Sequence, residues 1–284
     1  MRLVTYERNR KQSIGVLSDA GVIDLPAASG GSLPSDLLTL LQQGEAALAQ
    51  ARKAAAEGKT MIPLAEVQIR APLSRPGKIL GIGLNYRDHA AEGARELPKY
   101  PLIFTKAVSA VIGNGDSIRI PQVTQAVDFE GELAVVIGTR AKDVSGTDAL
   151  DYVAGYTICN DVSARDYQQR SGHSAGKSFD TFAPLGPALI TRDEVPDPHV
   201  LDIRTVVSGE EMQHSNTRHL IFNIPYLIEY LSHVFPLEPG DVITTGTPAG
   251  VGVFRNPPRF LKPGDTVRIE VQGVGVLQNP VVAS

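Results

Sequence analysis

The stretch Val127-Asp128-Phe129-Glu130-Gly131-Glu132-Leu133-Ala134-Val135-Val136-Ile137 decides how this chain folds, and we read it as a β-strand. Successive side chains of a strand point to opposite faces of the sheet. One face of this stretch is apolar, whereas the other begins with three carboxylates and turns apolar at Ala134 and Val136. A strand this rich in Val, Ile and Leu is typical of a strand buried on both sides.

The three carboxylates, Asp128, Glu130 and Glu132, need a positively charged partner in a buried strand, because each unpaired buried ion costs on the order of several kcal/mol. Hard oxygen ligands on a rigid strand suit Mg²⁺, Mn²⁺ or Ca²⁺. The alternative is a strand end that faces solvent or pairs with arginine, which is the usual situation of a single acidic residue. The Glu-x-Glu spacing favours the divalent-metal site.

The composition is that of a globular protein, with 42% hydrophobic and 20% charged residues in 284. A net charge of −4 without a long basic run predicts no nucleic-acid partner. No apolar stretch approaches the roughly 20 residues of a membrane span. The N-terminus lacks an apolar signal core, and the single cysteine fits a reducing compartment, so we expect a cytoplasmic protein without a membrane partner.

The chain divides into two expected parts. Residues 3–25 alternate like a hairpin, Ser35 is positioned to cap a short helix, and an Ala-rich helix is expected over residues 45–57. These segments carry no cluster of chemically reactive side chains. We therefore expect a small N-terminal accessory domain over residues 1–70 and a catalytic domain over residues 71–284.

A candidate acid–base pair lies in the segment 85–92, which is read as a short helix capped near Asn85. His89 and Glu92 are one helical turn apart, so Glu92 could orient His89 and raise its basicity for taking a proton from water. The alternative, favoured by spacing alone, is an exposed pair of little consequence. The other histidines show no metal-ligand spacing and are expected to be ordinary surface or core residues: His173, His199, His214, His219 and His233.

Lys177 belongs to a segment that almost imitates a phosphate-binding loop. That motif needs four residues between its glycines, but only three separate Gly172 from Gly176, so a nucleotide triphosphatase is rejected. Lys177 remains a candidate for polarising a carbonyl or binding a carboxylate, because a flexible ammonium suits both tasks.

Two further strands are expected to end in functional groups. The apolar strand 153–159 delivers Asp161 to its end, where carboxylates from two strands can converge on a metal. Cys159 lies within that strand and reads as a small buried hydrophobe rather than a nucleophile. The glycine-rich loop 246–252 offers backbone N–H groups and the Thr247 hydroxyl as a nest for a carboxylate, with an ordinary tight turn as the alternative.

Taken together, these segments resemble the fumarylacetoacetate hydrolase family from about residue 78 to residue 282. They are most similar to its smaller bacterial and mitochondrial branch of acylpyruvate hydrolases and 2-oxo-acid decarboxylases. The resemblance rests on five motifs in order: Gly83-Leu84-Asn85-Tyr86 followed by His89 and Glu92, Phe129-Glu130-Gly131-Glu132-Leu133, Asn160-Asp161-Val162-Ser163-Ala164-Arg165-Asp166, Gly176-Lys177-Ser178-Phe179-Asp180, and Thr245-Gly246-Thr247-Pro248-Ala249-Gly250-Val251-Gly252. Each motif is weak alone, and their order makes them specific.

The resemblance implies a β-rich α+β fold, namely a mixed β-roll catalytic domain with a small N-terminal α/β domain, usually assembled as a homodimer. It also implies one Mg²⁺ or Mn²⁺ per subunit, for which Ca²⁺ could substitute, with Asp128 beside the ligand set rather than in it. The implied metal ligands are Glu130, Glu132 and Asp161. The implied catalytic residues are His89, Glu92 and Lys177, and the implied substrate contacts are Thr247, Arg165 and Gln168.

The predicted function is a metal-dependent hydrolase that cleaves a carbon–carbon bond in a 2,4-dioxo acid of the acylpyruvate or fumarylpyruvate type. His89 would activate water, and an enolate would form beside the ion. Decarboxylation of an oxaloacetate-like acid and keto–enol isomerisation are alternatives because they share this enolate, and ureidoglycolate-type lyases are a weaker one. A non-catalytic, metal-dependent binding protein for small acids is an alternative of another class, and the acid–base pair argues against it. The loops around residues 95–98 and His173 are expected to select the substrate.

Overall fold

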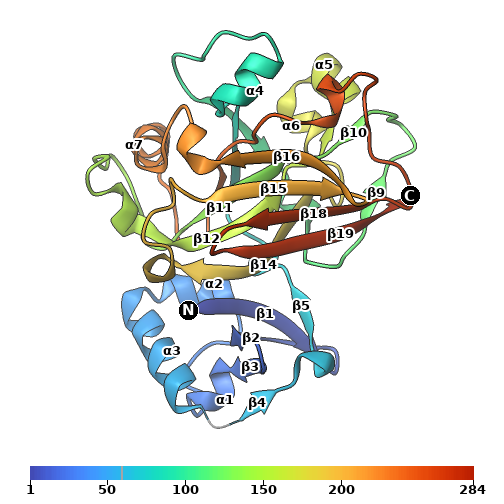
Figure 1. Ribbon diagram of the computed structural model, residues 1–284. Coiled ribbons are helices and arrows are strands. Elements are labelled where there is room, and N and C mark those ends of the chain that lie inside the picture. Colours follow the sequence, from blue (N-terminus) through green and yellow to red (C-terminus); the bar gives the residue numbers. More distant parts are fainter. Residues whose placement is uncertain (59) are drawn as a thin grey trace.

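The computed structural model describes residues 1–58 and 60–284 and shows a β-rich α+β fold. In Figure 1 a small N-terminal region packs beneath a larger body of strands, and helix α4 lies at the far end of that body. The described strands form one twelve-stranded sheet, one five-stranded sheet and one two-stranded pair. No described helix has both the length and the apolar character that crossing a membrane requires.

The N-terminal region is a meander of strands covered by three helices. Its strands are β1 (Arg2–Arg8), β2 (Lys11–Ser18), β3 (Gly21–Asp24), β4 (Met61–Ile62) and β5 (Gln68–Arg70). Its helices are α1 (Leu25–Ala28), α2 (Leu37–Gln42) and α3 (Glu45–Glu57), with the 3₁₀ turn η1 (Leu64–Glu66). The predicted hairpin and Ala-rich helix are confirmed, but the cap of α2 is Asp36, whose carboxylate accepts from Thr39 N at 2.8 Å, and not Ser35.

The large sheet runs through both parts of the chain in the order β4-β3-β2-β1-β14-β12-β11-β17-β6-β7. The strands contributed by the larger part are β6 (Ile79–Gly83), β7 (Leu102–Lys106), β8 (Val111–Ile112), β11 (Gly131–Ile137), β12 (Val153–Asn160), β14 (Ala183–Thr191) and β17 (Val242–Thr244). Strand β1 pairs antiparallel with β14, so the N-terminal strands extend the sheet of the larger part. A domain boundary at residue 70 remains a prediction.

The five-stranded sheet packs on the large sheet through a shared apolar core that includes Phe129, Ile158 and Ile269. Its strands in order are β16 (Glu210–Asn216), β15 (Asp202–Val207), β18 (Thr266–Val271), β19 (Gly275–Ala283) and β9 (Ile118–Ile120). The remaining helices are α4 (Arg87–Glu92), α5 (Arg165–Ser171), α6 (His173–Gly176) and α7 (Ile224–Val234), and the remaining 3₁₀ turns are η2 (Val108–Ala110), η3 (Ala149–Tyr152), η4 (Arg192–Glu194), η5 (Thr217–His219) and η6 (Gly252–Phe254).

The stretch 127–137, which was predicted to form one strand, is divided into two strands. β10 (Val127–Asp128) pairs with β13 (Ser163–Ala164), and β11 starts only at Gly131. The ladder breaks because the N–H of Glu130 donates to the Asn160 side chain at 3.1 Å. Burial on both sides is confirmed, since the apolar residues of β11 belong alternately to two different cores. One of these cores includes residues from all three N-terminal helices.

The cap expected for α4 at Asn85 is not formed. This helix begins after Tyr86 without a side-chain cap. Asn85 is instead fully buried, and its amide donates to Thr245 O at 2.7 Å and accepts from Phe222 N at 2.8 Å. Asn85 therefore joins the start of α4 to the loop after β17.

Candidate metal centre and active site

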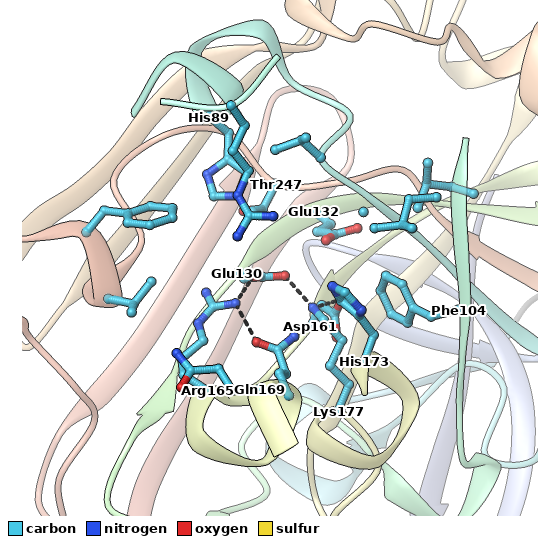
Figure 2. Close-up of a pocket in the computed structure, with 18 residues that line it drawn as sticks. His89, Phe104, Glu130, Glu132, Asp161, Arg165, Gln169, His173, Lys177 and Thr247 are labelled. Atoms are coloured by element: carbon cyan, nitrogen blue, oxygen red, sulfur yellow. Dashed lines mark hydrogen bonds and ion pairs between the residues drawn. The ribbon is translucent and has the colours of Figure 1, made fainter. Parts of the chain in front are cut away.

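Three buried carboxylates meet where β11 begins and β12 ends. Glu130 immediately precedes β11, Glu132 lies within it, and Asp161 directly follows β12. The strands are antiparallel neighbours, with Glu132 opposite Cys159, so the start of one lies beside the end of the other. One carboxylate oxygen from each of the three acids lies within 4.8 Å of the others (Figure 2). Sheet register thus assembles the cluster that the sequence proposed as metal ligands.

Cationic side chains surround two of these acids. The ammonium of Lys177 lies 2.6 Å from both Glu130 Oε2 and Asp161 Oδ2, and Arg165 Nη1 lies 2.6 Å from Glu130 Oε1. Lys106, at the end of β7, places its ammonium 2.5 Å from Asp161 Oδ1 and is itself fully buried. Sequence reasoning missed Lys106, whose one signal was a charged residue ending the apolar strand β7.

Glu132 is the least compensated member of the cluster. Its carboxylate accepts from Gly246 N at 2.7 Å. Burial, together with the charges of Asp161 and Glu130, raises the pKa of Glu132 well above its usual range. Burial alone would also raise the pKa of Glu130, but the charges of Lys177 and Arg165 outweigh burial and lower it.

This arrangement fits a divalent cation. The cluster offers three hard carboxylate donors, and an added positive charge beside Glu132 would favour its ionised form. Oxygen donors of this kind match Mg²⁺ and Mn²⁺ rather than softer metals. Assignment of the three acids as metal ligands remains a prediction.

Asp128 turns away from the cluster because the ladder breaks directly after it. Its carboxylate accepts from Gly252 N at 2.8 Å, Val253 N at 2.9 Å and Arg165 Nε at 2.9 Å. The sequence reading placed Asp128 on one face with the two glutamates, and the structure corrects that reading. Asp128 instead joins Arg165 to the loop that carries Phe254.

His89 and Glu92 face each other on α4, with Nδ1 of His89 3.3 Å from Glu92 Oε2. The second oxygen of Glu92 accepts from Gly250 N at 2.9 Å, which ties the helix to the glycine-rich loop. The His89 ring packs 5.8 Å from the ring of Phe254. Because Nδ1 faces Glu92, Nε2 is the nitrogen left for the pocket, and the acid–base role of the pair stays a prediction.

A pocket of about 310 Å³ opens above the cluster, and Figure 2 shows the labelled side chains around it. Its lining includes most of the predicted site residues, namely His89, Glu130, Glu132, Asp161, Arg165, Gln168, Lys177 and Thr247. The lining also includes Arg95 and His173, which belong to the two loops expected to select the substrate. Other lining residues were not singled out from the sequence, among them Phe104, Gln169 and Phe254.

His173 corrects the expectation of an ordinary histidine. Its ring stacks 5.8 Å from that of Phe104 at the pocket wall, and burial together with the Lys177 ammonium lowers its pKa. Lack of metal-ligand spacing had argued for an ordinary residue, but a pocket wall requires no such spacing. Cys159 is buried within β12 as expected, and burial raises the pKa of its thiol.

The predicted substrate contacts differ in whether they have a polar atom free to bind a ligand. Arg165 Nη2 is buried and has no hydrogen-bond partner among the described residues, so a ligand could use it. Gln168 Oε1 lies 3.1 Å from Arg165 Nη1 and steadies the guanidinium. The hydroxyl of Thr247 donates to Gly131 O at 3.0 Å and accepts from Gln213 Nε2 at 2.8 Å.

Comparison with known proteins gives a consistent set of relatives. Residues 78–282 match the family model described as fumarylacetoacetate (FAA) hydrolase C-terminal. The chain is 50% identical over 265 residues to the mitochondrial oxaloacetate tautomerase FAHD2A of Bos taurus, covering 92% of this chain and 84% of that protein. It is 46% identical over 288 residues to the Rattus norvegicus protein of the same name, covering 99% and 92%.

Solved structures of related proteins superpose on the whole chain. Maleylpyruvate hydrolase from Sphingobium sp. SYK-6, determined with manganese(II) and pyruvate, superposes with a TM-score of 0.84 at 32% identity and full coverage of both chains. A fumarylacetoacetate hydrolase from Exiguobacterium antarcticum gives a TM-score of 0.84 at 33% identity, again with full coverage of both chains.

Proposed function

Because the chain belongs to the fumarylacetoacetate hydrolase family, we propose that it interconverts the keto and enol forms of an oxaloacetate-type 2-oxo acid. The observation that carries this proposal is the buried cluster of Glu130, Glu132 and Asp161 opening into the same pocket as His89. The named tautomerase relatives favour isomerisation over the carbon–carbon hydrolysis expected from the sequence, so hydrolysis becomes the second candidate.

Glu130, Glu132 and Asp161 would hold a Mg²⁺ or Mn²⁺, whose charge would stabilise negative charge developing on the 2-oxo oxygen. Lys177 contributes a fixed cation beside the same position. Burial alone would lower the pKa of Lys177, but the carboxylates of Asp161 and Glu130 outweigh burial and raise it. Lys177 therefore stays protonated and steadies the oxygen electrostatically, without giving up its proton.

His89 moves the proton at carbon. In the keto-to-enol direction, His89 Nε2 takes one proton from carbon 3, and the electron pair of that C–H bond forms the carbon–carbon double bond. The 2-oxo oxygen takes up one proton from water, and His89 returns its own to solvent, so atoms and charge balance. Glu92 holds Nδ1 and thereby selects the ring nitrogen that reacts.

Arg165 is proposed to bind a substrate carboxylate. Its Nε and Nη1 are engaged by Asp128 and Glu130, which fixes the guanidinium plane, while Nη2 remains available. A preoriented guanidinium loses little entropy when it binds a carboxylate.

The test is a spectroscopic assay of the enol ultraviolet band of oxaloacetate, with pyruvate release measured in the same samples. Tautomerisation predicts faster decay of the band with Mg²⁺ or Mn²⁺, no acceleration with EDTA, and no matching release of pyruvate. An unchanged decay rate would refute the proposal, and stoichiometric pyruvate would indicate decarboxylation instead.

Hydrolysis of a 2,4-dioxo acid is the second candidate, since a relative with this fold is a maleylpyruvate hydrolase. The same His89–Glu92 pair could activate water rather than take a proton from carbon. A panel of acylpyruvates separates the two candidates, because hydrolysis releases one pyruvate for each substrate consumed.

We also propose a homodimer, on the family resemblance, and a reducing compartment such as the cytoplasm, on the single buried Cys159. Light scattering of the purified chain checks the dimer, and a mass near twice 30.3 kDa is expected.

A further inference from the structure

Gln213 connects the strand of the metal cluster to the glycine-rich turn. It lies on β16, and only 1% of its surface is exposed. Its Oε1 accepts from Gly131 N at 3.0 Å, between the two clustered glutamates. Its Nε2 donates to Thr247 Oγ1 and to Pro248 O, both at 2.8 Å. The oxygen and the nitrogen of the Gln213 side-chain amide are therefore both hydrogen-bonded. The Gly131 N–H on one side and the Pro248 carbonyl on the other fix which way the amide is oriented.

This orientation decides where the hydroxyl proton of Thr247 goes. A hydroxyl has one proton to donate. Because Gln213 already donates to the oxygen, Thr247 directs its proton to Gly131 O at 3.0 Å. The hydroxyl then has no proton left for a substrate carboxylate. In the turn 246–248 the Thr247 N–H is the peptide donor left for a carboxylate, because Gly246 N donates to Glu132 at 2.7 Å and proline has no N–H. Gln213 and the Thr247 hydroxyl hold the turn in place.

Tight packing against β16 is a second, independent observation that this strand holds the glycine-rich loop in place. Gly250 has φ of +106°, and a Cβ there would lie 1.9 Å from Met212 O, so the loop is pressed directly against β16. Ser215 Oγ donates to Asp88 Oδ2 at 2.7 Å, and Asp88 is adjacent to His89 on α4. Gln213 and Ser215 are two residues apart and share one face of the strand. One strand thus supports both the turn and the helix that border the pocket.

We propose that Gln213 is a positioning residue that presents the turn 246–248 to a substrate carboxylate other than the one assigned to Arg165. The inference rests on the proposed function for the identity of that carboxylate. It assigns a role to a strand outside the motifs through which the family was recognised. Gln213 acts through Thr247 and the Gly131 peptide and does not itself touch the substrate.

The test measures binding of oxalate, a small non-reacting dicarboxylate, by calorimetry at saturating Mn²⁺. We expect Gln213→Leu and Thr247→Val each to weaken oxalate binding about tenfold, since each leaves buried polar groups unpaired. Because both act through one network, the double variant should also be weaker by about tenfold rather than about a hundredfold. In turnover, Gln213→Leu should raise KM more than it lowers kcat. Gln213→Glu, which preserves side-chain shape, gives the same direction if the leucine variant does not fold.

Asn216→Ala is the matched control on the same strand. Asn216 is also buried, but it bonds to Val200 O and Asp202 Oδ1, away from the pocket. This control should lose thermal stability and keep wild-type oxalate affinity.

Three results would overturn the inference: unchanged oxalate affinity in folded Gln213 variants, additive losses in the double variant, or no oxalate binding by the wild type. Failure of the proposed function is a separate outcome. If oxaloacetate is not tautomerised while Gln213→Leu still weakens oxalate binding, the reaction is wrong and the positioning role stands.

Discussion

Replacing Glu132 by glutamine should stabilise the metal-free protein and abolish its response to metal. Glutamine retains an acceptor for Gly246 N and removes a charge from a buried cluster whose oxygens lie within 4.8 Å of one another. Two like charges 4.8 Å apart repel by about 3 kcal/mol at an effective dielectric constant of about 20. The raised pKa of Glu132 already relieves part of this repulsion, so we expect a gain of about 1–3 kcal/mol, or a melting temperature about 2–6 °C higher in EDTA.

Bound metal should make the wild type more stable than Glu132→Gln, the reverse of their order in EDTA. A cation present at a hundred times its Kd stabilises the wild type by about 2.7 kcal/mol. Loss of one carboxylate ligand should weaken Mn²⁺ binding by at least the roughly hundredfold seen when groups supporting a ligand are lost, so the variant should gain little. Thermal unfolding in EDTA and in Mn²⁺ should therefore give curves whose order reverses between the two conditions.

Glu130→Gln is the informative control. Glu130 is paired with Lys177 and Arg165 at 2.6 Å, so its loss should destabilise the metal-free protein by about 3–5 kcal/mol. The reasoning fails if Glu132→Gln destabilises the EDTA form as Glu130→Gln does. It also fails if Mn²⁺ raises the melting temperature of wild type and Glu132→Gln equally.

Three other predictions follow from single contacts. His89→Asn should lower kcat by about 10²–10⁴-fold while leaving Mn²⁺ affinity unchanged, because His89 moves the proton and lies outside the acidic cluster. Steady-state kinetics and calorimetry check this prediction, and a loss of Mn²⁺ binding in the variant would contradict it. For Asp265, burial alone would raise the pKa, but the Arg259 side chain and Lys262 N–H outweigh burial and lower it. The stabilising effect of the Asp265 carboxylate is therefore complete above the unfolded pKa of about 3.9 and is lost as pH falls through the lower folded pKa. The melting temperature of Asp265→Asn should depend less on pH between about 5 and 3 than that of wild type. The same pH dependence of melting in both proteins would count against the pairing. Asp36→Ala should cost about 1 kcal/mol of stability, whereas Ser35→Ala should cost almost nothing, because Asp36 caps α2; equal effects in chemical unfolding would reject this assignment.

Local periodicity in the sequence predicted much of the fold. The Val, Ile and Leu content of residues 127–137 correctly predicted a strand buried on both faces, which the structure confines to residues 131–137. The carboxylates at the start of this strand and the end of the next anticipated the cluster of Glu130, Glu132 and Asp161. These predictions succeeded because they depend on the apolar content of a strand and on where neighbouring strands start and end.

The sequence could not reveal partners that are distant along the chain. Gln213 lies 82 residues from Gly131, and Lys106 lies 55 residues from Asp161, so no local spacing links either pair. The cap at Asn85 was wrong for the same reason, since tertiary contacts with Thr245 and Phe222 use its amide. The reaction was equally hard to choose, because hydrolysis, decarboxylation and isomerisation use one set of motifs.

The N-terminal helices pack against the face of β11 that carries Glu132. Ala134 and Val136 follow Glu132 on the same face of β11, and they pack in the core that Leu37, Leu41 and Leu48 help to build. A shortened protein lacking these helices would expose the apolar part of that face, directly next to Glu132. The positions of the predicted metal ligands should then be less well fixed although no acidic residue is changed. Residues 1–58 therefore stabilise a site to which they contribute no side chain.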